Sequence, residues 1–344
     1  MSGSGRGRAA RRGLLPKLAQ GLALARVYRA YRARRARGVE KPIRLWIEPT
    51  DRCNLHCVMC PTGTGEFFPG GPGFMAFETF AKVIDEAKDF AFDVNLHHRG
   101  ESLIHKELPR MIRYAADAGL FTNLHTNGTL LDEARSRALL ASGLDFLSVS
   151  FDALDPEEYP RVRPGAKFEK TLEAVRAFLR LRGESGARRP YVAIEAIDFR
   201  PGDGRASEEK KAALEALFPG DPPDRVRVKA LHNWAGSADS GEGLDTRRFA
   251  PCTFLWYSLT VLWDGRVMPC PQDTHGHLAL GNVRDASLAA IWDGDALVSL
   301  REKMARAEWQ DLVPCRTCDR IFRTRRAGLP KEGWREFLWE NLTR

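Results

Sequence analysis

The chain has 344 residues, of which 43% are hydrophobic, and this is enough to build one large domain or two of ordinary size. No run of about 18 uninterrupted apolar residues is present to cross a bilayer, and no apolar signal region with a cleavage site follows the N-terminal arginines. Seven cysteines, an odd number grouped as three and four, argue against an extracellular disulfide framework. We therefore expect a cytoplasmic protein whose thiols are free to bind metal.

The positive charge is concentrated in the first 39 residues. The net charge is +8, but this segment holds ten arginines and one lysine with no acidic residue, which leaves 42 basic and 45 acidic residues elsewhere. That balance argues against a nucleic-acid partner. Residues 1–41 are predicted to form a basic leader, in which apolar side chains recur at helical spacing: Leu14, Leu15, Leu18, Leu22, Ala25 and Tyr28. Two interpretations stay open: an amphipathic helix lying peripherally on an anionic membrane or an acidic partner, or a solvated leader or transit peptide.

From residue 42 onward, strand patterns alternate with helix patterns. The predicted strands cover 43–49, 94–98, 121–126, 145–151, 191–197 and 225–231, and the predicted helices cover 75–90, 106–119, 131–143, 168–182 and 207–217. Repeated β-α units of this length form a parallel sheet covered by helices, and six of them make an open or partial barrel. In such α/β sheets the active site lies at the carboxyl ends of the strands.

Three cysteines follow the first predicted strand in a C-x3-C-x2-C array: Cys53, Cys57 and Cys60. Three cysteinates can hold three irons of a [4Fe–4S] cluster and leave the fourth iron without a protein ligand. Such an open coordination site lets a metal bind a substrate or cofactor. A zinc site completed by a histidine such as His56 is the alternative, but the spacing and the position after a first strand favour the cluster.

In this array and its position the chain resembles the radical SAM superfamily. In that family the open iron binds S-adenosylmethionine, and the reduced cluster cleaves this cofactor to release a 5′-deoxyadenosyl radical. The resemblance implies that residues 42–235 form an α/β fold, a partial (β/α)6 barrel of the radical SAM type. It also implies a [4Fe–4S] cluster on the three cysteines, S-adenosylmethionine as cofactor, and an electron donor such as flavodoxin or ferredoxin.

Shorter motifs match the same family at the strand ends. "HRGES" (98–102) resembles its Gly-Gly-Glu motif, with Arg99 in place of the first glycine, so that Gly100 and Glu101 are expected to receive the cofactor's ammonium. Glu101 could otherwise be a helix N-terminal charge. The resemblance implies four further cofactor contacts, although Asn127 could be only a turn residue before a glycine: Met59 on the adenine, Asn127, Ser150 on the ribose or methionyl part, and Arg163 near the carboxylate.

The four remaining cysteines are Cys252, Cys270, Cys315 and Cys318. The first two bracket a predicted β-hairpin that turns at Asp264–Gly265, and the last two form a C-x2-C pair. The segments 263–273 and 280–292 resemble the SPASM/Twitch extension of radical SAM enzymes. We therefore expect residues 236–325 to form a small α+β domain with an auxiliary [4Fe–4S] cluster on these four thiols, zinc being the alternative. Residues 326–344 are predicted to form a C-terminal helix.

The resemblance implies a radical SAM oxidoreductase of the dehydrogenase type. Its expected substrate is a small hydroxylated molecule such as a sugar, cyclitol or lipid headgroup, with the auxiliary cluster taking up the electron left after hydrogen abstraction. A peptide-modifying maturase and a redox-neutral epimerase or dehydratase are the alternatives. No spacing identifies a catalytic acid or base among the polar residues expected at the barrel mouth, which are His97, His98, His125, Glu195, His232 and Trp234.

Overall fold

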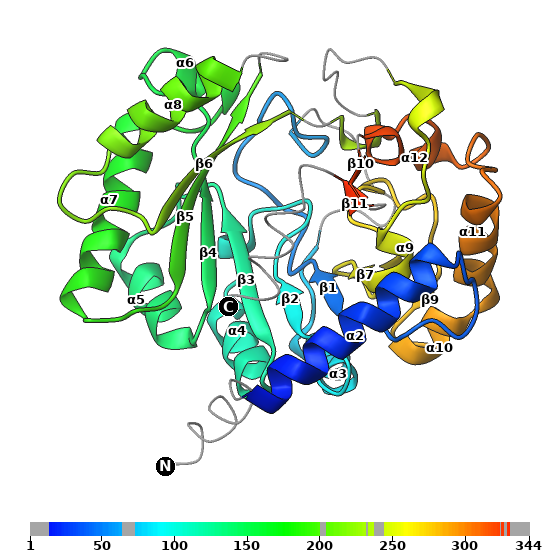
Figure 1. Ribbon diagram of the computed structural model, residues 1–344. Helices are drawn as coiled ribbons and strands as arrows, with labels where there is room; N and C mark the ends of the chain where they lie inside the picture. The colour runs from blue at the N-terminus through cyan, green and yellow to red at the C-terminus, as the bar shows by residue number, and fades with distance from the viewer. Residues whose placement is uncertain are drawn as a thin grey trace.

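The computed structural model describes residues 14–63, 73–199, 204–231, 233–236, 244–323, 325–326 and 329–330. One sheet with the strand order β6-β5-β4-β3-β2-β1-β7-β8-β9 runs through these residues (Figure 1). Its first six strands are parallel and lie side by side in chain order. They are β1 (Arg44–Ile47), β2 (Asp93–Asn95), β3 (Phe121–Thr126), β4 (Phe146–Ser150), β5 (Tyr191–Asp198) and β6 (Arg225–Ala230). The sheet does not close, because β6 and β9 form its two ends, and the predicted partial barrel is confirmed.

Helices cover one face of the parallel strands (Figure 1). The sequence predicted five of them, and the short α6 (Glu158–Val162) is additional. Asp132 caps α5 by accepting a hydrogen bond from the Arg135 amide, and Gly143 ends that helix in the left-handed region at φ 89°. The five are α3 (Phe77–Ala87), α4 (Leu108–Asp117), α5 (Glu133–Ser142), α7 (Phe168–Glu184) and α8 (Gly204–Ala216).

Side chains alternate strictly between the two faces of the parallel strands. On the helix-covered face most of them are apolar and fully buried, as at Leu45, Val94, Leu124, Leu147 and Ile194. On the opposite face, here called the inner face, the register aligns polar residues across neighbouring strands: Asn95 with Asn123, His125 with Ser148, and Ser150 with Glu195 and Arg227. The apolar face supplies the core, and the inner face is left for binding and chemistry.

The predicted hairpin extends this sheet instead of standing apart from it. β7 (Ser258–Val261) pairs parallel with β1, and β8 (Arg266–Met268) and β9 (Gly281–Asn282) follow antiparallel. The turn between β7 and β8 contains Gly265 at φ 87°, which confirms the predicted turn. Helical segments of the C-terminal part follow: α9 (Phe254–Tyr257), α10 (Leu288–Asp293), α11 (Asp295–Ala305), α12 (Val313–Arg316) and the 3-10 turns η2 (Trp234–Gly236), η3 (Thr246–Arg248) and η4 (Asp319–Phe322). A further 3-10 turn, η1 (Ser102–Ile104), lies after β2 in the barrel.

The two ends of the described chain cover α2, within the predicted leader, and a short strand pair at the start of the predicted C-terminal helix. α2 (Leu14–Arg32) packs its second half on the auxiliary segment, where the Tyr31 hydroxyl donates to the Pro251 carbonyl at 3.1 Å. β10 (Arg325–Arg326) pairs with β11 (Leu329–Pro330) where the C-terminal helix was predicted to begin. Residues 331–344 and His232 lie outside the described residues. No helix in the described ranges is long and apolar enough to cross a membrane.

Candidate functional site

The loop after β1 carries the three-cysteine array. Amides of this loop donate to the end of α6 and the residues after it, from Val58 to the Val162 carbonyl and from His56 to the Pro164 carbonyl. A Cβ on Gly63 would lie 2.5 Å from the Cys57 carbonyl oxygen, so the loop folds back too tightly for a side chain there. Burial raises the pKa of the Cys57 thiol to about 11. A metal centre would have to stabilise the thiolates, as iron does.

Gly100 and Glu101 connect the end of β2 to this loop. A Cβ on Gly100 would lie 2.4 Å from the Thr50 carbonyl oxygen, so only glycine allows this approach. The Glu101 amide donates to the Arg52 carbonyl at 2.8 Å. Its buried carboxylate accepts hydrogen bonds from the amides of Leu103 and Asn127 and from the Thr126 hydroxyl. Burial raises the pKa of Glu101 despite these donors.

Asn127, after β3, reaches the same loop from the other side. Its side-chain nitrogen lies 4.0 Å from the Cys53 sulfur and donates to Asn54 at 3.0 Å. Its side-chain oxygen accepts from the amide and hydroxyl of Thr129. Asn127 is therefore more than a turn residue, because it orders the loop beside Cys53.

Arg163 forms a buried ion pair with Asp152. Its Nε lies 2.9 Å from the Asp152 carboxylate, and its Nη1 lies 3.8 Å from the Cys57 sulfur. Burial opposes the charge, but Asp152 and Cys57 raise the pKa of Arg163 overall. The other Asp152 oxygen accepts from the Ile197 amide at 2.8 Å. A fixed positive charge thus faces Cys57, where it would stabilise a thiolate.

The two remaining predicted cofactor residues lie in different surroundings. Ser150 ends β4 on the inner face, level with Glu195 of β5. Met59, within the cysteine loop, is buried in the main apolar core. All six predicted cofactor residues are therefore at or next to the carboxyl ends of β1 to β4.

Sequence reasoning missed a buried charged network behind this loop. Arg99, the departure from the family motif, donates to both Glu48 oxygens at 2.7 Å and to the Thr274 carbonyl at 3.2 Å. His98 bridges Glu48 at 2.9 Å and the Pro271 carbonyl at 3.0 Å. Burial alone would raise the pKa of Glu48, but Arg99 and His98 lower it to about 2. Two features of the sequence could have indicated this network: the acidic Glu48 at the end of the first predicted strand, and Arg99 in place of the motif's glycine.

The inner face carries a second group of charged residues beyond the loop. Lys229 donates to Glu195 at 2.6 Å, and Nδ1 of His125 lies 3.9 Å from the same carboxylate. Burial favours the neutral acid, yet Lys229 and His125 lower the pKa of Glu195 to about 2. The His125 ring stacks on His97 at 4.0 Å. Because the side chains of Lys229 and His125 are 36% and 32% exposed, a substrate entering from solvent can reach them.

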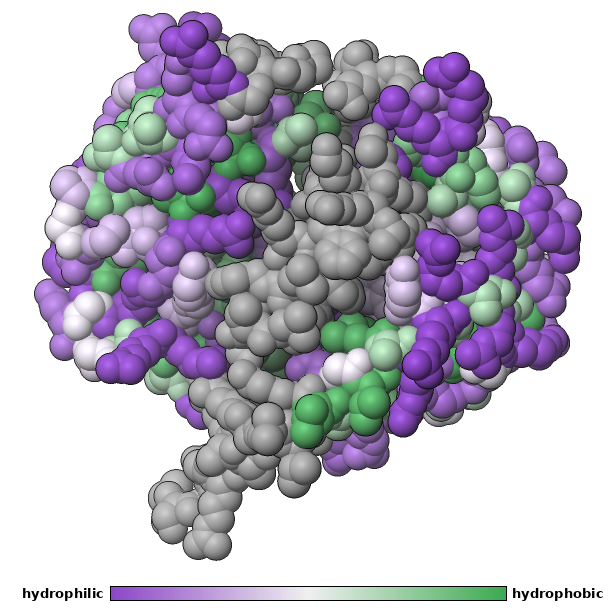
Figure 2. All heavy atoms as spheres, in the orientation of Figure 1, coloured by the Kyte–Doolittle hydropathy of each residue, from purple (hydrophilic) through white to green (hydrophobic). Residues whose placement is uncertain are grey.

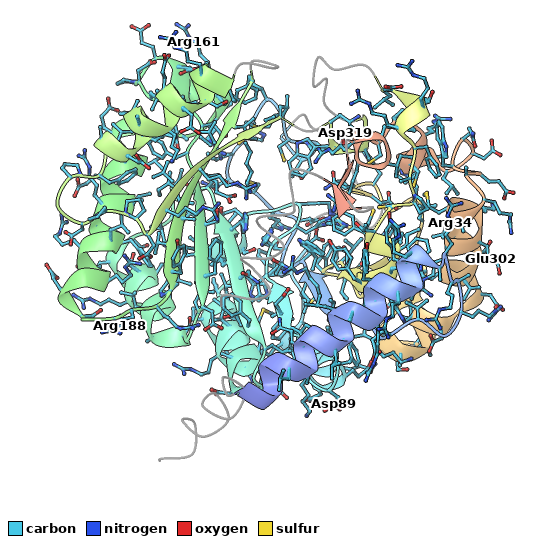
Figure 3. All side chains as sticks on the ribbon, in the orientation of Figure 1. Arg34, Asp89, Arg161, Arg188, Glu302 and Asp319 are labelled. Atoms are coloured by element: carbon cyan, nitrogen blue, oxygen red, sulfur yellow. The ribbon has the colours of Figure 1, made fainter. Side chains whose placement is uncertain are left out.

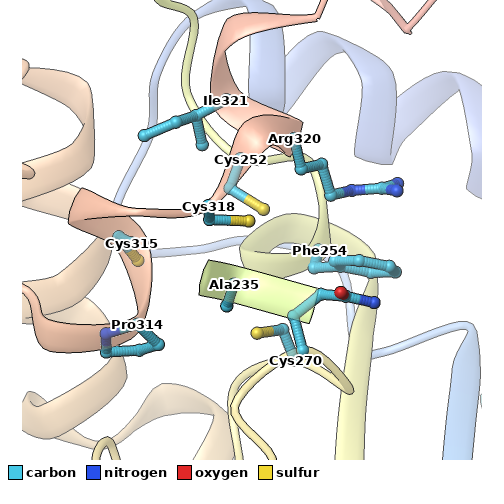
Figure 4. A pocket seen from close by; sticks show the side chains of 10 residues that line it. Ala235, Cys252, Phe254, Cys270, Pro314, Cys315, Cys318, Arg320 and Ile321 are labelled. Carbon is cyan, nitrogen blue, oxygen red and sulfur yellow. The ribbon is translucent and has the colours of Figure 1, made fainter. Parts of the chain in front are cut away.

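Figure 4 shows the four C-terminal cysteines around one cavity. Ala235 and Arg320 also line it, and the Arg320 guanidinium lies 3.9 Å over the ring of Phe254. Burial, then the neighbouring Cys252 thiol, raise the pKa of Cys318 to about 12. Among the described residues, no three Cys, His, Asp or Glu side chains are placed around the position of a single metal ion. Four thiols around one enclosed space are a donor set that suits a cluster without an open iron.

The structure is an open α/β barrel with three thiols in the loop after β1, and four more thiols around a cavity on an extension of the same sheet. A model of the radical SAM superfamily matches residues 47–192, and a model of the SPASM iron–sulfur cluster-binding domain matches residues 252–319. The chain belongs to the radical SAM superfamily and carries a SPASM domain. Its cofactors are a [4Fe–4S] cluster, an auxiliary iron–sulfur cluster and S-adenosylmethionine, as the resemblance implied.

Curated relatives match most of the chain at modest identity. The PqqA peptide cyclase of Ruegeria pomeroyi is 29% identical over 82% of this chain and 81% of its own length. The PqqA peptide cyclase of Granulibacter bethesdensis is 26% identical over 82% and 81%. The tungsten-containing aldehyde ferredoxin oxidoreductase cofactor-modifying protein of Pyrococcus furiosus is 25% identical over 73% and 81%.

Solved structures share the fold. SuiB of Streptococcus suis, bound to precursor peptide SuiA, superposes with a TM-score of 0.59 at 15% identity over 81% of this chain and 70% of SuiB. BtrN in complex with AdoMet and 2-DOIA superposes with a TM-score of 0.55 at 18% identity over 82% and 94%. These likenesses support the barrel and its extension as one architecture.

Proposed function

We propose that this radical SAM enzyme modifies a peptide. The observation that carries the proposal is the match to PqqA peptide cyclases along more than four fifths of both chains, barrel and SPASM domain together. The small hydroxylated substrate expected from the sequence is the less supported alternative. An inner face whose charged groups stay open to solvent suits an extended chain, which presents one side chain to the site while the rest remains outside.

Each predicted cofactor residue would have a role around one of the cofactors. Cys53, Cys57 and Cys60 would hold the first cluster, with Arg163 as the nearby positive charge. Glu101 and Asn127 would order the loop and, with Gly100, Ser150 and Met59, surround the S-adenosylmethionine. When bound, the reduced cluster and S-adenosylmethionine supply a 5′-deoxyadenosyl radical that abstracts hydrogen. The SPASM cysteines, Cys252, Cys270, Cys315 and Cys318, would hold the auxiliary cluster.

On the inner face, Lys229, Arg227 and His125 would receive the substrate. The positive charges of Lys229 and Arg227 lie next to a single carboxylate, that of Glu195. This group of side chains therefore keeps a net positive charge while its histidines are neutral. Such a surface attracts acidic side chains or a peptide carboxylate. His125 is the inner-face imidazole best placed to accept a proton from a substrate, because its side chain is 32% exposed and lies 3.9 Å from the Glu195 carboxylate.

Anaerobic incubation of the reconstituted enzyme with S-adenosylmethionine and dithionite tests the proposal. One set of reactions contains synthetic peptides of 20 to 60 residues encoded by short reading frames beside the gene, and a parallel set contains inositols and hexoses. We expect a peptide to raise 5′-deoxyadenosine formation above the substrate-free rate and to change in mass. Stimulation by a cyclitol or sugar, with every peptide unchanged, would overturn the proposal and favour the small-substrate alternative.

A further inference from the structure

We propose that the outer side of α2 docks the enzyme onto an anionic lipid surface. Three of the six large apolar side chains that are exposed in the described residues lie on this one helix: Leu18 at 54%, Leu22 at 59% and Tyr28 at 38%. Leu18, Leu22, Ala25 and Arg29 follow the spacing i, i+4, i+7 and i+11, which places them on one side of a helix. Figure 2 shows a hydrophobic area over α2, beside hydrophilic residues toward the helix's C-terminal end.

The opposite side of the helix is fixed to the protein. Val27, Ala30 and Tyr31 are buried, and the Tyr31 ring meets the Trp256 ring edge-on at 5.5 Å. The Trp256 indole nitrogen donates to the Arg35 carbonyl at 2.8 Å. At the end of the helix, Arg34 donates to the Ala305 carbonyl at 2.8 Å (Figure 3). Because these contacts fix the rotation of α2, the helix cannot turn Leu18 and Leu22 toward the core.

The charges around the exposed leucines indicate which kind of partner this side of α2 binds. Arg29 and Arg32 are exposed in the last turns of α2, and the sequence before the helix adds four arginines and no acidic residue. A single convex helix side offers no groove to hold a peptide, whereas leucine and tyrosine bordered by arginines suit the boundary between acyl chains and anionic headgroups. The occupant we infer is therefore a membrane surface rich in anionic lipid.

Vesicle flotation of the full-length holoenzyme tests this inference, with phosphatidylcholine vesicles that contain either half phosphatidylglycerol or none. We expect binding to the anionic vesicles at 50 mM NaCl and at least a tenfold loss at 500 mM, since salt screens arginine contacts. The Leu18→Ser, Leu22→Ser variant and the Arg29→Glu, Arg32→Glu variant should each lose at least tenfold. The charge-matched control Arg137→Glu, Arg161→Glu should bind as the parent does, because Arg161 lies far from α2 (Figure 3).

Iron content and circular dichroism of each variant confirm that the fold is intact, and a variant that misfolds is replaced by the milder Leu22→Gln. Equal flotation of the parent and the leucine variant would overturn the proposal. So would a concentration-dependent dimer, seen by sedimentation without vesicles, that the leucine variant abolishes, because the side would then bind a second copy of the chain. The readout does not involve turnover, so it is independent of the proposed peptide substrate.

Discussion

Arg99 and Glu48 form a buried bidentate ion pair, in which Arg99 Nε and Nη2 each lie 2.7 Å from one carboxylate oxygen of Glu48. The pair joins the ends of β2 and β1 directly behind the cysteine loop. Through its third nitrogen, Arg99 also donates to the Thr274 carbonyl, four residues after Cys270. The residue that departs from the family's glycine thus connects the barrel to the SPASM domain.

Replacing Arg99 by the family's glycine should destabilise the protein by about 3–5 kcal/mol, because the buried Glu48 carboxylate would lose its bidentate arginine partner. Anaerobic guanidinium unfolding, followed by circular dichroism, measures this change. The double variant Arg99→Gly, Glu48→Gln should recover part of the loss, because it removes the buried Glu48 charge that Arg99 no longer compensates. Equal unfolding free energies of the two variants would show that the ion pair does not explain the cost.

Glu101→Gln should leave the first cluster in place and weaken S-adenosylmethionine binding by about 10- to 100-fold, the equivalent of one charge-assisted hydrogen bond. A glutamine can accept through only one of its two terminal atoms, so its amide group would face the Asn127 or Leu103 amide donor. Equilibrium binding and iron content are the measurements, and the exposed Glu107→Gln is the matched control. An unchanged binding isotherm would exclude Glu101 from the cofactor site.

The sequence predicted those parts of the fold that depend on short-range pattern. The alternating elements and the turn at Gly265 are local, and both are confirmed. The parallel pairing of β7 with β1 depends on residues more than 200 positions apart, and nothing in the local pattern of β7 specifies a partner strand. The ion pair of Arg99 with Glu48, and the contact of His98 with the same carboxylate, likewise depend on the fold, which brings these residues beside the SPASM domain.

His97 should make stability depend on pH between about 7.5 and 5.5. Its Nδ1 is buried without a hydrogen-bond partner, and burial, then His125, lower its pKa well below 6.5. As the pH falls through about 6.5, His97 takes up a proton in the unfolded chain but stays neutral in the folded protein. The free energy of unfolding is therefore highest above that pH and decreases as the pH falls. One such group costs about 1.4 kcal/mol at pH 5.5.

Unfolding free energies of the parent and of His97→Phe at pH 7.5 and 5.5 check this sign. The phenylalanine keeps a ring on His125 but removes the titration, so its stability should fall less on acidification. His277→Phe serves as a surface control, since that side chain is 44% exposed. The same pH dependence in His97→Phe and in the parent would mean that His97 is not the responsible group.

Arg320 should set the reduction potential of the auxiliary cluster. It lines the four-cysteine cavity, and although burial opposes its charge, Tyr257 and the thiols of Cys252, Cys318 and Cys270 raise its pKa. A permanent positive charge beside the thiolates stabilises the reduced, more negative cluster. Arg320→Gln removes that charge, and we expect the potential to fall by on the order of 50–100 mV at an effective dielectric constant near 20.

An electron paramagnetic resonance redox titration measures the potential without any substrate. Arg323→Gln is the control, because it makes the same change of charge three residues away, where Arg323 pairs with Asp319 at 2.7 Å outside the cavity lining. The control should shift the potential by much less, since its charge is already compensated and partly solvated. Equal shifts of the potential in the two variants would mean that the net charge of the protein explains the effect. The position of Arg320 beside the cysteines would then have no influence of its own. A lower potential makes the cluster a poorer electron acceptor, so Arg320→Gln should also slow any oxidative turnover that passes an electron to it.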